Sequence, residues 1–399
     1  MNKKLHVRLW TSLMIVFTLL LTACGSENPI STPIPAATLT PEEPAIQLSP
    51  MQNSSLVVPN TPTPEGGAQA VQQDPNATLL VEEWSGYEKD EFWQPFIDQH
   101  PNNKVDYTFI PDDAESFAKA ITNPEIDIMH PCANYFRLFV EKGLVQPIDT
   151  SRITNWASIY PELAKLGEVD GQQYFVPWDW GFNAILVRTD KVKTVPTSWN
   201  DLWNPEYKGR VSFYDSGNEA YYAAALALGF NPYEVTPEQD AQIKQKLIDL
   251  VPNLADYWSD PTTVSNQVAS GDLWVIGNAW NESFRFLKEE NVPVQYVMPK
   301  EKAIGWMCGY SISSQTKNLD LAYDFINARL DAQSEANMAN DQGYGPSNKD
   351  AIALMDQDIV SSMNLDQPNL LQNTLFMQPL TETEHQHYTD LWTEVKAAP

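Results

Sequence analysis

Residues 78–129 read TLLVEEWSGYEKDEFWQPFIDQHPNNKVDYTFIPDDAESFAKAITNPEIDIM, and strand patterns alternate with helix patterns along them. Short apolar runs bounded by turn residues predict strands, and apolar residues at helical spacing predict helices. The expected elements are strands over 78–84, 104–110 and 126–129, a helix over 88–100, and a helix from Asp113 or Glu115 to 121. This order is typical of an α/β domain with a largely parallel sheet and right-handed crossovers.

The same alternation continues toward the C-terminus. A helix over 134–142 is expected to end at Gly143, and an Ala-rich helix over 219–228 is expected to end at Gly229, since glycine favours the C-terminal cap. The other expected elements are strands over 211–214, 273–277, 294–298 and 309–313, and helices over 237–251, 254–259 and 319–331. The sequence therefore predicts two α/β lobes around one cleft.

The N-terminus reads as a targeting segment rather than as part of the fold. Lys3, Lys4 and Arg8 precede a mostly apolar run over 9–21 that is too short for a comfortable transmembrane helix. The run ends in Leu-Thr-Ala-Cys-Gly at 21–25, which is similar to the lipobox of bacterial lipoproteins. That resemblance implies a signal peptide over 1–23 and a diacylglyceryl group on Cys24; the alternative is an ordinary secretory signal with a chance cysteine.

Residues 24–77 are expected to form a tether. Pro, Thr, Ser, Asn, Gln and Ala dominate them, as in Thr61–Gly67. Such a composition buries too little apolar surface to offset the entropy of the chain. The folded region is therefore expected to begin near residue 78.

The formal net charge of −27 excludes a nucleic-acid partner, because phosphates require Lys and Arg. An acidic surface attracts cationic solutes to a cleft; simple solubility is an equally good reading of surface charge. Besides Cys24 the chain has two cysteines, Cys132 and Cys308, and an exported chain can join such a pair in a disulfide.

The folded region resembles the spermidine/putrescine-binding proteins of bacterial polyamine ABC importers, which are extracellular solute-binding proteins. The resemblance keeps segment order over the whole of 78–399. It rests on 84–87 (WSGY), 127–149 with GLVQPID at its end, 174–190, 198–209 (SWNDLWNPEYKG), 215–219, 271–273, 280–281, 299–301, 304–307, 322–330 and 343–344.

The resemblance implies a two-lobe periplasmic-binding-protein clamp with mainly parallel central sheets and a hinged cleft between the lobes. The lobes would comprise 78–182 plus 306–350, and 183–305 plus 351–399. It also implies no catalysis and no cofactor. A monomer is expected, held at the membrane by the lipid on Cys24, on the cell surface or in the periplasm, and working with an ABC permease and ATPase.

Carried over by position, the residues that would bind a linear polyammonium ion are of three kinds. Aromatic faces would cover the methylenes and attract the charge. The aromatic residues are Trp84, Tyr135, Trp280, Trp306 and Tyr344, the acids are Asp215 and Glu219, and the hydroxyl is Ser85. Taken singly, each Trp could instead be a core residue, Glu219 a helix-start residue that complements the dipole, and Asp215 a turn or cap residue.

The chain departs from the family pattern at two positions of the implied site. Cys308 stands where the family has an aspartate that holds an ammonium group, and Cys132 stands where it has a small hydroxyl residue. The resemblance therefore implies a Cys132–Cys308 disulfide at the pocket edge, with two buried free thiols as the alternative. Asp179 would restore the lost anion if it faces the cleft. If it faces solvent, the ligand carries fewer charges, or is a quaternary amine boxed by Trp178, Trp180 and Trp306.

Two other function classes remain open from the sequence. Asp215 and Glu219 could form the acid/base pair of a secreted hydrolase, although a nucleophile elbow, an HExxH motif and a phosphate loop are missing from the sequence. A ligand sensor would suit the tether as well as a transport protein does. No metal site is expected; His385 and His387, spaced for opposite strand faces or a loop, are the alternative to that expectation.

Overall fold

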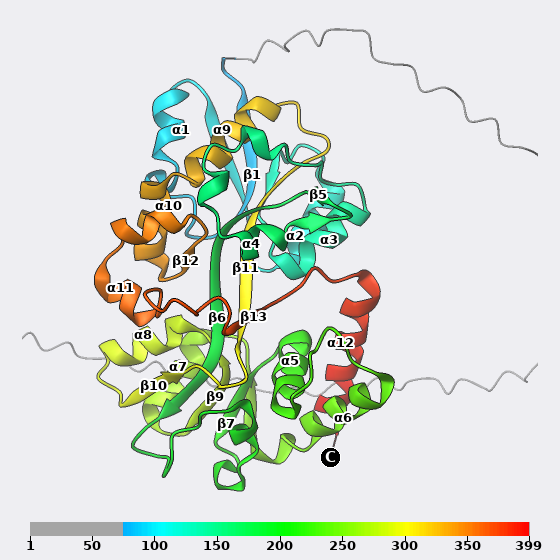
Figure 1. Ribbon diagram of the computed structural model, residues 1–399, viewed down its shortest axis with the longest axis vertical. Helices are drawn as coiled ribbons and strands as arrows, with labels where there is room; N and C mark the ends of the chain where they lie inside the picture. The colour runs from blue at the N-terminus through cyan, green and yellow to red at the C-terminus, as the bar shows by residue number, and fades with distance from the viewer. Residues whose placement is uncertain (1–74, 399) are drawn as a thin grey trace, which may run out of the picture. The chain divides into compact units, whose positions relative to one another are not determined.

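The computed structural model describes residues 75–398 (Figure 1). The predicted signal peptide, the lipidation of Cys24 and the predicted tether up to residue 74 lie outside the described residues. Within the described part, none of the helices is both long enough and apolar enough to cross a membrane.

One sheet of eleven strands runs through this part of the chain. Its strand order is β2-β1-β3-β11-β6-β9-β7-β8, with β10 and β12 paired to β6 and β13 paired to β11. The strands are β1 Thr78–Trp84, β2 Lys104–Ile110, β3 Ile128–Met129, β6 Val176–Arg188, β7 Val211–Tyr214, β8 Leu254–Trp258, β9 Val275–Ala279, β10 Val294–Val297, β11 Ala303–Ile312, β12 Gly345–Pro346 and β13 Thr374–Phe376. A separate hairpin pairs β4 Glu168–Val169 with β5 Gln172–Gln173.

The pairing is parallel toward both ends of the sheet and antiparallel at its centre. β1 pairs in parallel with β2 and β3, and β7 pairs in parallel with β8 and β9. The long strands β6 and β11 pair antiparallel from Asn183–Ile304 to Val176–Tyr310, and Figure 1 shows both running between the upper and lower groups of elements. The predicted α/β class is confirmed.

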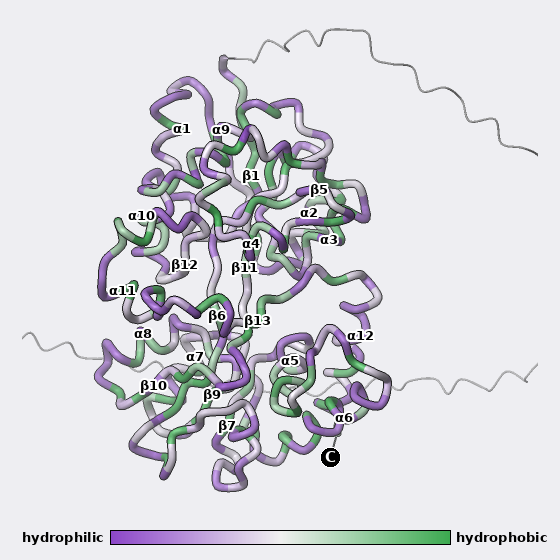
Figure 2. Tube along the Cα trace, in the orientation of Figure 1, coloured by the Kyte–Doolittle hydropathy of each residue, from purple (hydrophilic) through white to green (hydrophobic). Residues whose placement is uncertain are grey.

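The helices cover the strands on either side of this centre. Asp112 caps α2 by accepting the N–H of Glu115, and α5 ends at Gly229, whose positive φ of 79° suits glycine. The α-helices are α1 Gln94–Gln99, α2 Asp113–Thr122, α3 Ala133–Glu141, α4 Pro161–Lys165, α5 Gly217–Leu228, α6 Pro237–Ile248, α7 Pro261–Ser270, α8 Asn281–Glu289, α9 Leu319–Arg329, α10 Ala332–Gln342, α11 Gln357–Ser362 and α12 Glu382–Lys396. Figure 2 shows the Ala-rich α5 greener than the largely purple α10.

Two large apolar cores lie on the two sides of the sheet centre. One packs β1, β3 and part of β11 against α9, and the other packs β7 and β9 against α5, α6 and α12. β6 contributes to both because all of its residues are buried. The residue boundaries expected for the two lobes stay a prediction.

Some predicted elements are wrong. Residues 254–258 form β8, not a helix, because they pair in parallel with β7; LADYW fits either structure locally, so tertiary pairing decides. The helix expected over 88–100 is a 3-10 turn, Asp90–Phe92, followed by α1. Trp93 breaks it with φ of −150°, and Pro95 opens the new helix, where a missing N–H costs nothing.

Candidate functional site

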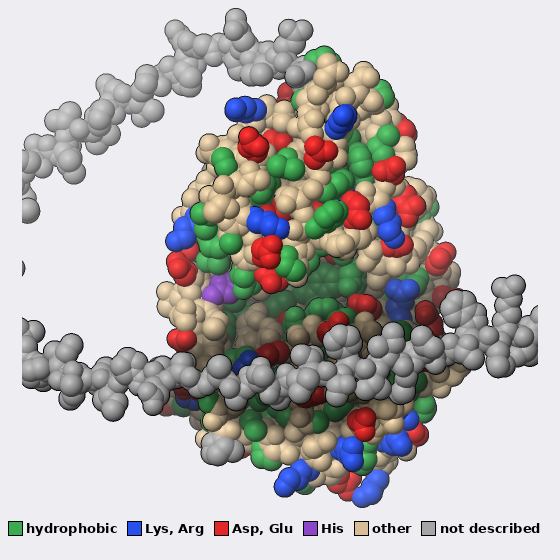
Figure 3. All heavy atoms as spheres, turned by 180° about the vertical axis from the view of Figure 1, so that it is seen from behind, with side chains coloured by type: hydrophobic (Ala, Val, Ile, Leu, Met, Phe, Trp, Pro, Cys, Tyr) green, Lys and Arg blue, Asp and Glu red, His purple; other side chains and the backbone are tan. Residues whose placement is uncertain are grey.

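A cavity of about 840 Å³ lies between the two groups of elements, within the size range of ligand pockets. Figure 3 shows the hollow on the face opposite to the view of Figure 1, with apolar and acidic side chains visible in it. All the residues predicted to bind a ligand line it: Trp84, Ser85, Tyr135, Asp179, Asp215, Glu219, Trp280, Trp306 and Tyr344. Cys132 and Cys308 line it as well. Whether these residues bind a ligand stays a prediction.

The indole rings of Trp84 and Trp280 are half-buried and fixed in place. Trp84 is the last residue of β1, and its Nε1 donates to the carbonyl of His130 at 2.9 Å. Trp280, the N-cap residue of α8, packs edge-on against Tyr214 and Trp258 with ring centroids 5.2 and 5.3 Å apart. These rings are therefore pocket walls rather than core residues.

Trp306 and Tyr344 form a second aromatic corner. Their rings meet edge-to-face at 4.7 Å and 89°. A Cβ on Gly181 would lie 2.5 Å from the Trp306 ring, so glycine on β6 lets the indole lie flat against that strand. Tyr135, on α3, packs against His385 of α12, with ring centroids 4.3 Å apart and ring planes tilted by 47°.

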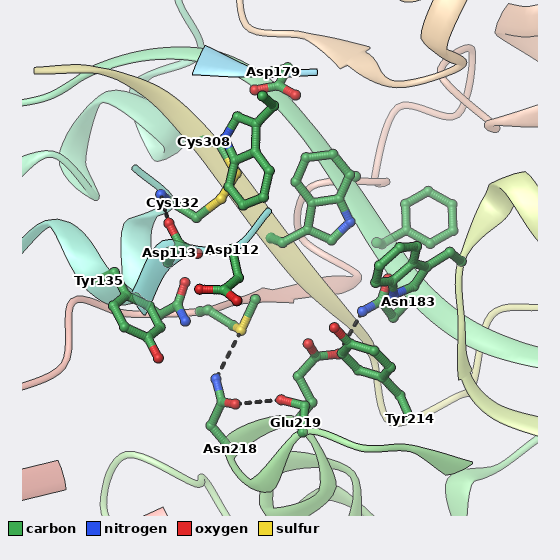
Figure 4. A pocket seen from close by; sticks show the side chains of 18 of the residues that line it. Asp112, Asp113, Cys132, Tyr135, Asp179, Asn183, Tyr214, Asn218, Glu219 and Cys308 are labelled. Carbon is green, nitrogen blue, oxygen red and sulfur yellow. Dashed lines mark hydrogen bonds between the residues drawn. A yellow bond between two sulfur atoms is a disulfide. The ribbon is translucent and has the colours of Figure 1, made fainter. Parts of the chain in front are cut away.

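Glu219 is a buried carboxylate, 6% exposed, on the first turn of α5. Its Oε2 accepts a hydrogen bond from Asn183 Nδ2 of β6 at 2.6 Å (Figure 4). Burial raises its pKa to about 7, although the amide of Asn183 acts in the opposite direction. No cation lies within 4 Å of Glu219 in the described structure, so its charge is left to be compensated by something that enters the pocket.

Asp215 lines the pocket but already has partners. It follows β7, and its Oδ1 accepts from Trp392 Nε1 and from Lys396 Nζ, both at 2.7 Å. Both donors come from α12, so Asp215 ties the end of α12 to β7. Its capacity to hold a further positive charge is correspondingly smaller than that of Glu219.

Asp179 is neither in solvent nor free in the cleft. Its side chain is 2% exposed, Tyr87 OH donates to its Oδ2 at 2.8 Å, and His130 Nε2 lies 3.4 Å from its Oδ1. Although burial by itself lowers the pKa of His130, Glu83 and Asp179 raise it to about 9. Asp179 lies opposite Cys308 in the pairing of β6 with β11. However, a protonated His130 already neutralises much of the charge of Asp179.

The alternative in which Trp178, Trp180 and Trp306 together surround a quaternary amine is wrong. Trp178 and Trp180 are at most 1% exposed and do not line the cavity. Their indole N–H groups donate to the carbonyls of Arg329 and Pro346 at 2.9 and 2.8 Å. Both rings are core residues, and Trp306 is the one that reaches the pocket.

His385 and His387 lie on α12, not on a strand or in a loop. His385 contacts the carbonyl of Asn134 through Nε2 at 2.9 Å, and His387 Nε2 lies 2.9 Å from Asp240 Oδ1. The two rings thus have separate partners. Over residues 75–398, no group of three or more His, Cys, Asp or Glu side chains is placed to hold a metal ion.

Cys132 and Cys308 are joined by a disulfide in the pocket wall (Figure 4). The bond links the residue before α3 to β11, across 176 positions of sequence. It closes a long loop inside the lobe that β1 and β11 share. The described structure therefore has no free thiol at this edge of the pocket.

Replacing both Cys132 and Cys308 with serine is expected to lower the free energy of unfolding by about 2–4 kcal/mol, because the disulfide restricts the unfolded chain across this long loop. Urea unfolding of the wild type with and without reductant measures the effect. The double variant is the control, since reductant should leave its midpoint unchanged. Equal midpoints for the oxidised and reduced wild type would show that the bond contributes no stability.

The sequence did not point to several residues that line the pocket. These are Asp112, Asp113, Asn183, Tyr214 and Glu282. Asp112 and Asp113 come from the start of α2, where acids are common for reasons unrelated to ligands. With these acids, six carboxylates line the cavity, whereas none of the lining residues in the described structure is Lys or Arg.

Comparisons with known proteins agree with this architecture. The profile of the family described as bacterial extracellular solute-binding protein matches residues 93–364. The spermidine/putrescine-binding periplasmic protein of Escherichia coli K12 is 29% identical over 303 residues, covering 75% of this chain and 86% of the relative. The putrescine-binding periplasmic protein PotF of E. coli is 27% identical over 291 residues, covering 68% and 78%.

Solved structures show the same fold. The spermidine/putrescine ABC transporter substrate-binding protein PotD of Streptococcus pneumoniae matches with a TM-score of 0.71 at 22% identity, over 81% of this chain and 99% of that chain. The Atu4243-GABA receptor matches with a TM-score of 0.65 at 23% identity, over 80% and 97%. Because the family profile spans more than half of the sequence, the chain belongs to the bacterial extracellular solute-binding proteins.

Proposed function

We propose that the protein is the substrate-binding subunit of an ABC importer and that it captures a polyamine, such as putrescine or spermidine, or a related organic cation. The observation that carries the proposal is the charge of the cavity. Six carboxylates and nine aromatic residues line it, and the described lining contains neither Lys nor Arg. A wall of this composition favours positively charged ligands.

The aromatic residues suit a cation with an aliphatic chain. Trp84, Trp280 and Trp306 are half-buried, so each presents ring surface to the cavity. A ring face attracts an ammonium group by about 0.5–2 kcal/mol and also covers methylene groups without requiring hydrogen bonds. The carboxylate of Glu219 would then pair with one ammonium end.

The fold does not select the ligand, since proteins of similar structure include the Atu4243-GABA receptor and a binding protein in complex with glucopine. Such compounds carry a carboxylate, which binds best to an arginine or lysine. The acidic lining of this cavity would repel that group. Charge thus favours a polyamine over an amino acid or an opine.

Capture would proceed by closure around the ligand, in which the two sides of the cavity approach each other as in other hinged binding proteins. Asn281 Nδ2 and Arg285 Nη1 of α8 already reach the carbonyls of Gly343 and Gln342 at the end of α10, at 3.4 and 3.3 Å. The liganded protein would dock on a permease and its ATPase. Membrane attachment through a lipid on Cys24 and a monomeric state belong to the same proposal.

The test is a titration of residues 25–399, monitored by calorimetry and by tryptophan fluorescence. The compounds titrated are putrescine, spermidine, spermine, 4-aminobutyrate and glycine betaine. We expect saturable binding of a polyamine with Kd of about 1 μM or below, and a fluorescence change because three indoles line the cavity. Binding of 4-aminobutyrate or betaine in preference to every polyamine would contradict the ligand class. Absence of binding throughout would contradict solute capture at this cavity.

A further inference from the structure

Asp113 is an acidic residue of the pocket to which neither the sequence nor the family resemblance pointed. It is the first residue of α2, half-buried, and lines the cavity next to the disulfide. Its Oδ1 accepts the backbone N–H of Cys132 at 2.8 Å, drawn as a dashed line in Figure 4. This bond fixes one oxygen. The nearby His130 cation acts on the carboxyl from a distance, but Asp113 forms no ion pair within the described residues.

The other acids of the cavity differ from Asp113 in how they are compensated. Asp215 is paired with Lys396, and Asp179 lies beside His130. Among the described residues, neither Asp113 nor Glu219 forms an ion pair, although both are withdrawn from water. Asp112 and Glu282 also form no ion pair in this part of the chain, but both are exposed to water. Asp113 and Glu219 are therefore the less exposed unpaired carboxylates that remain to meet a cationic ligand.

The two carboxylates face one region of the cavity from different elements. Asp113 stands on α2 and Glu219 on α5, and Tyr214, at the end of β7, lines the same cavity beside Glu219 (Figure 4). Burial raises the pKa of Tyr214, and the charges of Glu219 and Asp113 raise it further, so both act on the same hydroxyl. Figure 4 shows the labelled acids on separate sides of the drawn pocket.

Unsatisfied acceptors independently indicate a ligand with N–H donors. Asn183 is 1% exposed and Asn281 is 7% exposed, and both line the cavity. The Oδ1 atom of each has no hydrogen-bond partner in the described structure. A buried carbonyl oxygen without a donor is costly, and an ammonium group supplies up to three donors.

We propose that Asp113 binds the second positive charge of a dication whose first charge is held by Glu219 and Asn183. The inference rests on the proposed function and makes it narrower: the ligand carries two ammonium groups, and a monoamine fills one end of the site only. Cys132 positions Asp113 through its backbone N–H, so the disulfide segment supports the carboxylate at this end.

The test compares butane-1,4-diamine with butylamine, which has the same chain and one charge. Calorimetry at pH 8 on the wild type and on Asp113→Asn gives both affinities. Asn keeps an oxygen acceptor for the Cys132 N–H. We expect the variant to lose about 10- to 100-fold in diamine affinity, as for removal of a desolvated charge partner, and less than about 3-fold in butylamine affinity.

Glu115→Gln is the matched control. It removes one negative charge from the same turn of α2, but Glu115 is exposed, pairs with Lys119 and does not line the cavity. We expect it to change diamine affinity by less than about 2-fold, because exposed charges are screened. An equal loss in both variants would indicate a long-range field and overturn the assignment of Asp113.

Two further outcomes would overturn the inference separately from the proposed function. Wild-type protein that binds butane-1,4-diamine no better than butylamine has no second charge site, whatever the variant does. Undiminished diamine binding by Asp113→Asn removes Asp113 while leaving polyamine capture intact. A wild type that binds no amine removes both.

Discussion

Replacing Arg329 with methionine is expected to lower the free energy of unfolding by about 3–5 kcal/mol, because it removes one of the two cations that compensate the buried carboxylate of Glu83. Arg329 is 0% exposed. Its Nη2 lies 3.3 Å from Glu83 Oε2, its Nη1 donates to the carbonyl of Tyr87 at 2.8 Å, and its guanidinium carbon lies 4.8 Å from the Trp178 ring centroid. Urea unfolding at pH 7 measures the loss.

The loss is expected to be large because charges alternate along one buried chain of contacts. Glu83 lies between Arg329 and His130, and His130 leads to Asp179 at the cavity wall. Burial by itself raises the pKa of Glu83, but His130 and Arg329 bring it below its ordinary value. Without Arg329, the pKa of Glu83 should rise, and the network that fixes Asp179 should loosen.

Two controls separate this network from loss of side-chain volume. Arg152→Met removes a partly exposed surface arginine that pairs with Asp320 at 2.7 Å, and it should cost less than about 1 kcal/mol. The double variant Arg329→Met with Glu83→Gln should be less destabilised than the sum of the two single variants, because the pair is removed together. Additive losses would refute the coupling.

The fold could be predicted where local pattern and tertiary pairing agree. Residues 78–84 are a short apolar run that ends at a turn, and residues 104–110 alternate like a strand; the two segments form the parallel pair β1 and β2. β6 escaped prediction because Pro177, Asp179 and Gly181 interrupt its pattern. It is a strand because β11, β9, β10 and β12 supply its hydrogen bonds, and those partners are distant in the sequence.

The aromatic pocket residues could be placed by resemblance, since segment order carries each one to its element. Asp113 could not, because an acid at a helix start is ordinary and only the fold brings it near Glu219. The Glu83–His130–Arg329 network is equally hidden: its members are 47 and 246 positions apart, and no local pattern connects them. The sequence thus predicts which aromatic residues line the pocket, but it does not predict which of the buried charges are already compensated within the protein.

Replacing Glu219 with glutamine is expected to weaken polyamine binding by about 2–5 kcal/mol, because a buried ammonium group would lose its carboxylate partner. Gln is close to Glu in size and can still accept from Asn183 Nδ2. Calorimetry with butane-1,4-diamine measures the loss. An affinity within about 3-fold of the wild type would remove Glu219 from the site.

The same substitution should stabilise the ligand-free protein. Burial raises the pKa of Glu219 to about 7 in the folded state. Between the ordinary pKa of a glutamate and pH 7, the folded protein therefore keeps a proton on Glu219 that the unfolded chain has already released. Stability therefore falls as pH rises through this window, and the cost is complete above it. At pH 8, Glu219→Gln should gain on the order of 1–3 kcal/mol over the wild type, with the gain vanishing toward pH 4. A less stable variant at pH 8 would show that the carboxylate is compensated within the protein.

The pH dependence of binding follows with the opposite sign. A cationic ligand binds the ionised carboxylates, and burial also raises the pKa of Asp113 to about 7, so wild-type affinity should increase about 10- to 100-fold from pH 6 to 8. The other titratable groups near the two carboxylates should contribute little to this pH dependence. Burial raises the pKa of Tyr214 and Tyr296 near Glu219, and His130 near Asp113 has a pKa of about 9. Burial lowers the pKa of His385, the histidine of the described lining. Glu219→Gln retains Asp113 alone, so its affinity should change with pH about half as steeply on a logarithmic scale. An affinity independent of pH in the wild type would mean that neither carboxylate meets the ligand's charge.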